Sequence, residues 1–165
     1  MSNEGKRFEQ DFINSVPEHI FRYRFKDGTA GFAGQKNENV RFQAKNMCDF
    51  MLYHKKLFLL ELKSHKGKSF PFSCIRENQL EELSKAQSFV GIIPGIVFNF
   101  RDLERTYFVN IHHVHYYYYH AERKSFPLDF IQQWGLPIEG YKKRTRYSYD
   151  IETFIEELEG YHDKD

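Results

Sequence analysis

The chain has few cysteines, no long apolar run and almost no net charge. Its 165 residues contain only Cys48 and Cys74, too few for a disulfide framework and without the Cys-x-x-Cys spacing of a metal site, so we expect both to be buried thiols. No apolar run approaches the roughly 20 residues that span a bilayer. The first residues also lack the apolar core of a signal peptide. These absences predict a cytoplasmic protein with no membrane contact.

Bulky side chains are plentiful. Aromatic residues make up 18% of the chain, charged residues 28%, and the net charge is +1, which together exclude an intrinsically disordered protein. The length favours one domain over residues 1–165, and no internal repeat or linker divides it. We therefore expect a single globular domain.

The small net charge conceals a division of charge along the chain. Residues 150–165 hold seven acids and one lysine, a net charge of −6, which leaves +7 on the preceding residues. A basic body favours a polyanionic partner such as nucleic acid, because phosphate contacts release condensed counterions. An ordinary solvated surface is the alternative.

The stretch from Cys48 to Ser64 has two apolar runs on either side of the polar tip His54-Lys55-Lys56. This pattern predicts two strands joined by a turn. A hairpin centred on Lys55 places Asp49 opposite Glu61, with the two Cβ atoms roughly 4.5 to 5.5 Å apart. Side chains alternate along a strand, so Lys63 joins them on the same face. Two carboxylates and an ammonium group are predicted to converge there.

Residues 3–16 have apolar side chains at spacings of three and four, which predicts a helix. Glu9 belongs to that apolar stripe and is expected to face inward. A carboxylate facing a core is costly unless it is paired or binds a cation. Either an ion pair with Arg22 or Arg24 or a place in the functional site would explain Glu9.

The stretch 27–46 has no clear periodicity and contains several glycines. Long irregular segments inside compact domains are commonly functional, so it is a candidate nucleic-acid contact through Lys36, Arg41 and Lys45. A flexible excursion without function is the alternative.

The remaining pattern predicts alternating helices and strands around a mixed sheet. Strands are expected at 19–25, 92–100 and 105–111, and helices at 73–89, 126–133 and 150–160, the last capped by Asp150. Gln79 falls on the buried face of the second helix. It is either a core amide satisfied by backbone groups or an amide that lines the site.

Histidines 112, 113, 115 and 120 surround the run Tyr116 to Tyr119. No acid or cysteine recurs at a spacing suited to zinc, which argues against a zinc site. Tyrosine favours strands. The run is therefore expected to pack on the sheet and not to stack on bases.

Two further basic segments are candidate DNA contacts. One is the turn with Lys66 and Lys68; the other interleaves Lys142, Lys143 and Arg144 with tyrosines, a composition that fits a nucleic-acid surface.

Carboxylates are hard oxygen ligands suited to Mg²⁺ or Mn²⁺. A divalent ion held by Asp49 and Glu61, with Glu9 nearby, could polarise a phosphodiester and activate water, while Lys63 could orient the water or stabilise phosphoryl charge. The predicted chemistry is metal-dependent phosphodiester hydrolysis.

The ordered pattern of these elements resembles the PD-(D/E)xK nuclease superfamily. The order along the chain is a helix with Glu, a strand, a strand with Asp, a strand with Glu-x-Lys and then a helix. The chain looks most like the RecU-type Holliday junction resolvases. The features that carry this resemblance are Asn3-Glu4-Gly5 leading to Glu9, Asp49 with Tyr53, Glu61-Leu62-Lys63, Ser69-Phe70-Pro71-Phe72, the helix with Gln79, the strand 95–100 and Gly140-Tyr141.

The resemblance implies an α/β fold with a mixed, restriction-endonuclease-like sheet. It also implies a homodimeric, Mg²⁺-dependent endonuclease that cuts four-way DNA junctions by symmetric nicks during recombination or repair. Asp49 and Glu61 would bind the metal, Lys63 would be catalytic, and Glu9 would be a further site acid. The stretch 27–46 takes the place of the family's stalk, although it matches the family pattern at few residues.

Two other functions fit the same residues. One is a nuclease of this superfamily that acts on linear or other branched DNA in a restriction or repair role. The other is a junction-binding partner of recombination proteins whose nuclease activity is incidental.

Overall fold

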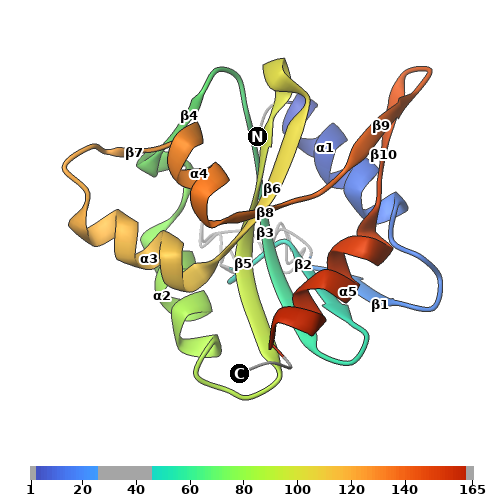
Figure 1. The fold of residues 1–165 in the computed structure, drawn as a ribbon, viewed down its shortest axis with the longest axis horizontal. Coiled ribbons are helices and arrows are strands. Elements are labelled where there is room, and N and C mark those ends of the chain that lie inside the picture. The colour runs from blue at the N-terminus through green and yellow to red at the C-terminus, as the bar shows by residue number, and fades with distance from the viewer. Residues whose placement is uncertain (1–2, 26–45, 163–165) are drawn as a thin grey trace, which may run out of the picture.

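The computed structural model describes residues 3–25 and 46–162, and its centre is a mixed six-stranded sheet. The strand order is β1-β2-β3-β5-β6-β8 (Figure 1). Only β3 and β5 pair in parallel within this sheet; the other neighbours pair antiparallel. The strands are β1 (Phe21–Arg24), β2 (Phe50–Tyr53), β3 (Leu57–His65), β5 (Ile92–Phe100), β6 (Arg105–Asn110) and β8 (Gly135–Pro137).

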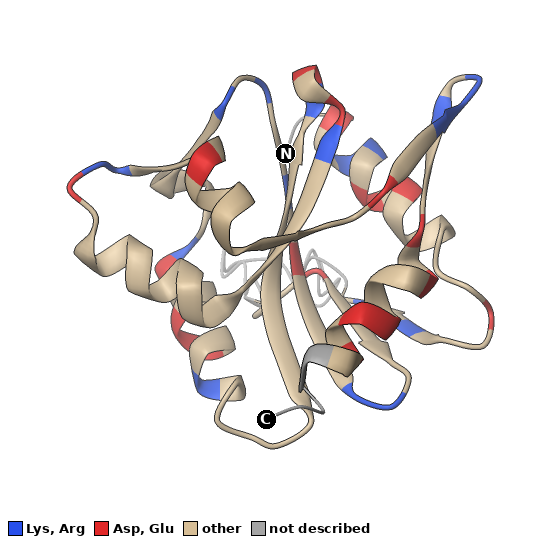
Figure 2. Cartoon of the chain, viewed as in Figure 1, with Lys and Arg blue, Asp and Glu red and all other residues tan. Residues whose placement is uncertain are grey.

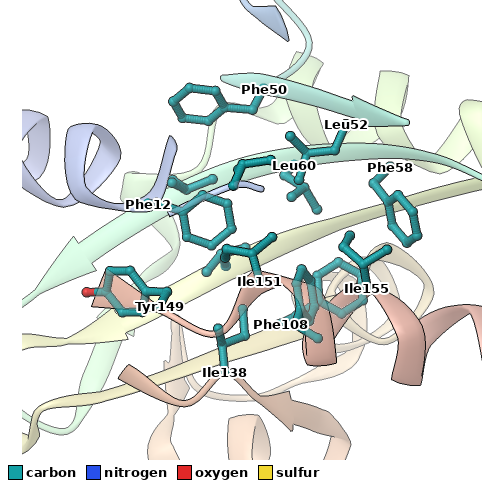
Figure 3. Packing of buried hydrophobic residues seen from close by; sticks show 14 of the residues in the cluster. Phe12, Phe50, Leu52, Phe58, Leu60, Phe108, Ile138, Tyr149, Ile151 and Ile155 are labelled. Carbon is teal, nitrogen blue, oxygen red and sulfur yellow. The ribbon is translucent and has the colours of Figure 1, made fainter. Parts of the chain in front are cut away.

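One face of the sheet is covered by two helices and a hairpin. These are α1 (Asn3–Asn14), α5 (Ile151–His162) and the antiparallel pair β9 (Gly140–Lys143) and β10 (Arg146–Tyr149). Figure 3 shows the packing, with Phe12 from α1 and Ile151 and Ile155 from α5 around Leu60 of β3. All four side chains are buried.

The other face carries the remaining helices and a small two-stranded ribbon. They are α2 (Glu77–Ala86), α3 (Ile111–His120), α4 (Leu128–Trp134) and the pair β4 (Ser69–Pro71) with β7 (Ser125–Pro127). Phe70, Phe98 and Phe126 form the centre of this second core. Two 3-10 turns, Phe72–Cys74 and Arg101–Leu103, link elements here.

Strand β3 lies between the two cores, and its alternating side chains serve both. Leu60 and Leu62 pack toward α1 and α5, whereas Leu59 packs in the second core. Residues of odd number in this strand therefore point to the side of α2 and α3. Glu61 and Lys63 belong to that side.

Most predicted elements are present, and two need correction. The helix expected at 73–89 begins only at Glu77, because Phe70 and Pro71 pair in β4 and a 3-10 turn follows. The run Tyr116 to Tyr119, expected on a strand, lies in α3. Asn110 caps that helix by accepting a hydrogen bond from the His112 N–H (2.9 Å).

Tertiary contacts explain why α3 overrides strand propensity. Val114 and Tyr117 are three residues apart and both join the second core, the spacing of one helix face. Tyr117 lies against Phe126 and Phe130, and Tyr118 stacks on Phe72. The expectation that these tyrosines are structural holds for Tyr117 and Tyr118, while Tyr116 and Tyr119 are exposed.

The acidic C-terminal segment forms the expected helix. Asp150 caps α5 by accepting from the Thr153 N–H (3.1 Å) and hydroxyl (2.9 Å). Among the helices that the structure describes, none is long and apolar enough to cross a membrane. The stretch 27–46 lies outside the described residues except for Asn46, so the predicted contacts Lys36, Arg41 and Lys45 have no structural account.

Candidate active site

The hairpin of β2 and β3 has the predicted register. Phe50 pairs with Leu60, and Tyr53 pairs with Leu57, so the symmetry point is Lys55. Asp49 stands one residue before β2, at the position that this register sets opposite Glu61. The predicted register is confirmed from Phe50 to Tyr53.

Backbone and side-chain contacts fix Asp49 between two strands. Its carbonyl accepts a hydrogen bond from the Phe25 N–H (2.9 Å), and its own N–H donates to the Leu60 carbonyl (3.1 Å). Its carboxylate Oδ2 accepts from the Leu62 N–H (2.7 Å). The side chain therefore lies along β3 beside Glu61, and not free in solvent.

Glu61 and Lys63 form a buried ion pair on the same side of β3. Lys63 Nζ lies 2.6 Å from Glu61 Oε1, and the Glu61 side chain is only 2% exposed. Burial by itself would lower the pKa of Lys63, but Glu61, aided by Asp49, outweighs it and leaves the pKa above its ordinary value. Lys63 is therefore held as a cation beside both acids.

The second oxygen of Glu61 is the clearest sign of a missing ligand. Glu61 Oε2 is buried and has no hydrogen-bond partner within the described residues. A buried carboxylate oxygen without a partner is costly. A hard cation at Oε2 would satisfy it, and the half-buried Asp49 carboxylate is the nearest second donor in the predicted set.

The donor set fits Mg²⁺ or Mn²⁺ better than a metal that needs a closed protein cage. Over residues 3–25 and 46–162 no group of three His, Cys, Asp or Glu side chains could hold an ion. Mg²⁺ commonly uses one or two carboxylates and completes its shell with water and substrate phosphate. Asp49 and Glu61 meet that need.

Two thiols border the acids, which the sequence pattern did not indicate. Burial, followed by the charges of Glu61 and Asp49, raises the pKa of Cys48 to about 12. Burial likewise raises the pKa of Cys74 to about 11, although neighbouring Lys63 acts to lower it. Both thiols stay protonated at neutral pH, and their neighbours place them around the acid–lysine cluster. Cys48 is buried as expected, whereas Cys74 is only partly so.

Glu9 faces inward, as its place in the apolar stripe predicted. It is 4% exposed, and its Oε2 lies 2.6 Å from Nη2 of Arg24. The Arg24 guanidinium stacks on the Phe50 ring, 5.7 Å from its centroid, and Phe50 belongs to the core beneath α1 and α5. The ion-pair explanation is thus confirmed, and a role for Glu9 in the site stays a prediction.

Gln79 is 1% exposed on α2. Its side-chain oxygen accepts a hydrogen bond from the Arg76 N–H (3.4 Å), which helps to cap the helix. This contact supports a core amide satisfied by the backbone. A role for Gln79 in the site stays a prediction.

The predicted DNA contacts that the structure describes are solvent-exposed. Lys66 and Lys68 lie in the turn after β3, and Lys142, Lys143 and Arg144 lie at the end of the β9–β10 hairpin. Figure 2 shows basic residues at the tip of this hairpin. They are accessible to a polyanion.

With this geometry in place, comparison with known proteins identifies the family. The model of the family "Recombination protein U" (RecU) matches residues 29–151. The chain belongs to the RecU family. The matched range contains Asp49, Glu61 and Lys63 and also most of the stretch 27–46, which the residue pattern alone had left poorly matched. Glu9 precedes it.

Two relatives extend this result. The chain is 32% identical over 174 residues to an uncharacterized protein of Bacillus subtilis (strain 168) derived from the SPbeta prophage, covering 95% of this chain and 87% of that protein. Its fold is similar to Hjc of Archaeoglobus fulgidus, a Holliday junction resolvase from an archaeal hyperthermophile, with a TM-score of 0.51. That match has 15% identity and covers 81% of this chain and 95% of the other. The mixed sheet flanked by helices therefore resembles the restriction-endonuclease-like fold of Hjc.

Proposed function

We propose that this protein is a metal-dependent endodeoxyribonuclease that resolves four-way DNA junctions by paired symmetric nicks. The observation that carries the proposal is the convergence of Asp49, Glu61 and Lys63 at the end of the β2–β3 hairpin in a chain of the RecU family. Nothing in this set points to a lost activity, because both acids and the lysine are present.

Asp49 and Glu61 would hold the ion, with Glu61 Oε2 as the donor that lacks a partner. A divalent ion bound there supplies Lewis-acid polarisation of the phosphodiester and makes water a better nucleophile. The two acids alone would repel DNA phosphate, so the activity should require Mg²⁺ or Mn²⁺.

Lys63 supplies a positive charge from a side chain, in addition to that of the metal ion. Its contact with Glu61 Oε1 holds the ammonium beside the acid that would bind the metal ion. Lys63 would stabilise developing charge on the phosphoryl oxygens or orient the attacking water.

Resolution of a junction needs two nicks, one in each of two opposed strands. The described residues carry a single acid–lysine cluster, so one chain supplies one cut. We therefore infer a homodimer that presents two such sites to one junction. Recombination proteins remain candidate partners.

Replacement of Asp49 by Asn tests this assignment. The variant keeps the shape of the side chain but removes a metal-binding charge, so Mg²⁺-dependent cleavage of a labelled junction should fall below detection while junction binding in a gel-shift assay persists. The matched control is Asp102→Asn, an exposed acid that accepts from the Gly67 N–H (3.1 Å). Cleavage retained by Asp49→Asn would refute the metal-ligand role.

A further inference from the structure

A polar cavity lies on the side of the sheet opposite Glu61 and Lys63. It has a volume of about 270 Å³ and is bounded by α1, the ends of β3 and β5, the turn after β5, and the β9–β10 hairpin. Ser64 and Asn99 line its floor, and Tyr147 and Tyr149 line one wall. None of the residues proposed for metal binding or catalysis belongs to the lining.

The floor of this cavity is rigid. Ser64 Oγ donates to Asn99 Oδ1 (2.8 Å), and Asn99 Nδ2 donates to Thr106 Oγ1 (3.0 Å). Asn99 and Thr106 are buried. These bonds join β3, β5 and β6, so the cavity is a built feature of the sheet.

Arg101 provides a cation at the cavity whose hydrogen-bonding capacity is only partly used. Its side chain is 22% exposed, and its buried Nε atom has no hydrogen bond within the described residues. The Glu4 carboxylate lies 2.5 Å from Nη1 as an ion pair, but Glu4 itself is 58% exposed. A guanidinium has five N–H donors, so Arg101 can keep or exchange its contact with the exposed Glu4 carboxylate and still donate its Nε–H to another anion.

The other charges around the cavity leave room for that anion. Asp11 is already bound by Arg146 Nε (2.5 Å), and Glu104 accepts the hydroxyl of Tyr147. Arg7 and Lys142 also line the cavity, and neither makes an ion pair within the described residues. Three acids and three cations thus line the cavity, and Glu4 is the acid that forms an ion pair with one of these cations, Arg101, within the described residues.

We propose that this cavity binds a phosphate group through Arg101, Arg7 and Lys142, with the Glu4 carboxylate as an internal competitor for Arg101. A phosphate presents several oxygens in three dimensions and can accept from three cations at once, which a planar carboxylate does less well. The first turn of α1 borders the cavity, and the positive end of a helix dipole favours an anion there.

The phosphate source that fits the position is the DNA backbone. Ser64 directly follows Lys63 in β3, so the cavity opens at the same end of the strand as the acid–lysine cluster. A DNA strand that passes over this end of the sheet would present neighbouring phosphates to both sites. That the phosphate belongs to DNA rests on the proposed nuclease function; a free phosphate or nucleotide would use the same groups.

The variants Arg101→Gln and Glu4→Gln test the site in opposite directions. Titration of inorganic phosphate, followed by calorimetry at low salt, should show Arg101→Gln binding about tenfold more weakly or worse, because a charge-assisted contact is lost. Glu4→Gln should bind more tightly, since it removes the competitor. The matched control is Lys85→Gln, an exposed lysine in the last turn of α2 that does not line the cavity.

A second arm measures anisotropy of a labelled four-way junction without Mg²⁺, in which no cleavage occurs. If the two variants change affinity in opposite directions for the junction but not for inorganic phosphate, the phosphate comes from the DNA backbone. If they do so for inorganic phosphate but not for the junction, the ligand is a free phosphate. Either result supports the site. Binding unchanged from the wild type in both variants with both probes overturns it. Cleavage is not read in either arm, so a failure of the nuclease proposal would be seen separately.

Discussion

Glu61 has one carboxylate oxygen on Lys63 and one buried oxygen without a partner in the described structure. A group in this state is destabilising until it is bound. The free valence of this one oxygen atom is the structural reason for the proposed requirement for a cation.

A stability measurement can therefore detect the ion without any DNA. Mg²⁺ or Mn²⁺ should raise the unfolding temperature of the wild-type protein, because ligand binding at about 100 times Kd stabilises the fold by roughly 2.7 kcal/mol. Asp49→Asn should lose most of this rise, whereas Asp102→Asn should keep it. An equal rise in all three proteins would place the ion elsewhere.

Glu159 is a second buried acid, and its negative charge stabilises the fold. It is 3% exposed on α5 and accepts from His54 Nδ1 (3.0 Å) and from the Lys55 N–H (2.8 Å) at the tip of the β2–β3 hairpin. Burial acts to raise the pKa of Glu159, but these hydrogen bonds outweigh it and the pKa lies below 4.5. Its ionised form therefore stabilises the fold above pH 4.5, and that stabilisation is lost as the pH falls through the lowered pKa.

Glu159→Gln should reduce the free energy of unfolding at pH 7 by about 1.5 to 3 kcal/mol, the range for a hydrogen-bonded charged group. The difference from wild type should shrink as the pH is lowered below 4.5. The control is Glu156→Gln, an exposed position on the same helix, which should change stability by less than about 0.5 kcal/mol. Urea unfolding at several pH values measures both, and a pH-independent difference would contradict the role of the charge.

At the scale of the element, β5 depends on a glycine at its centre. A Cβ at Gly95 would lie 2.3 Å from Cε2 of Phe108 and 2.6 Å from the Val109 carbonyl oxygen. Strands β5 and β6 can approach this closely only because Gly95 has no side chain. The Pro94-Gly95 pair thus does not interrupt the strand.

Gly95→Ala should destabilise the protein by about 1 to 3 kcal/mol through overpacking. Gly160→Ala is the matched comparison, because Gly160 lies in α5 with nothing within 4 Å of a new Cβ; it should stabilise by roughly 0.5 to 1 kcal/mol. Denaturant midpoints measure both changes. A stabilised Gly95→Ala would show that β5 and β6 are not packed as described.

Local sequence patterns correctly predicted those features that depend on short-range geometry. The hairpin symmetry about Lys55 and strand alternation placed Asp49, Glu61 and Lys63 together, and the Asp150 cap located α5. Tertiary packing decided the rest: α3 forms because Val114 and Tyr117 fit one core face. The Arg101 cavity could not be foreseen, since its lining comes from segments far apart in the sequence.

At the scale of the whole molecule, the acid–lysine cluster and the phosphate cavity lie on opposite sides of one strand end. The exposed lysines after β3 and on the β9–β10 hairpin extend this basic region (Figure 2). This end of the sheet therefore has cations on both of its sides, where we propose that DNA phosphates bind. In the proposed dimer, the spacing of the two cutting sites would select the junction over a simple duplex.

The most direct test of the proposed function compares a synthetic four-way junction with linear duplexes of the same arm sequences, each with Mg²⁺ and with a chelator. Wild-type protein should cut the junction into two nicked duplexes by symmetric incisions, only with Mg²⁺, and should leave the linear duplexes largely intact. Equal cutting of junction and duplex, or no cutting of either with Mg²⁺, would contradict the proposal that this protein is a junction resolvase.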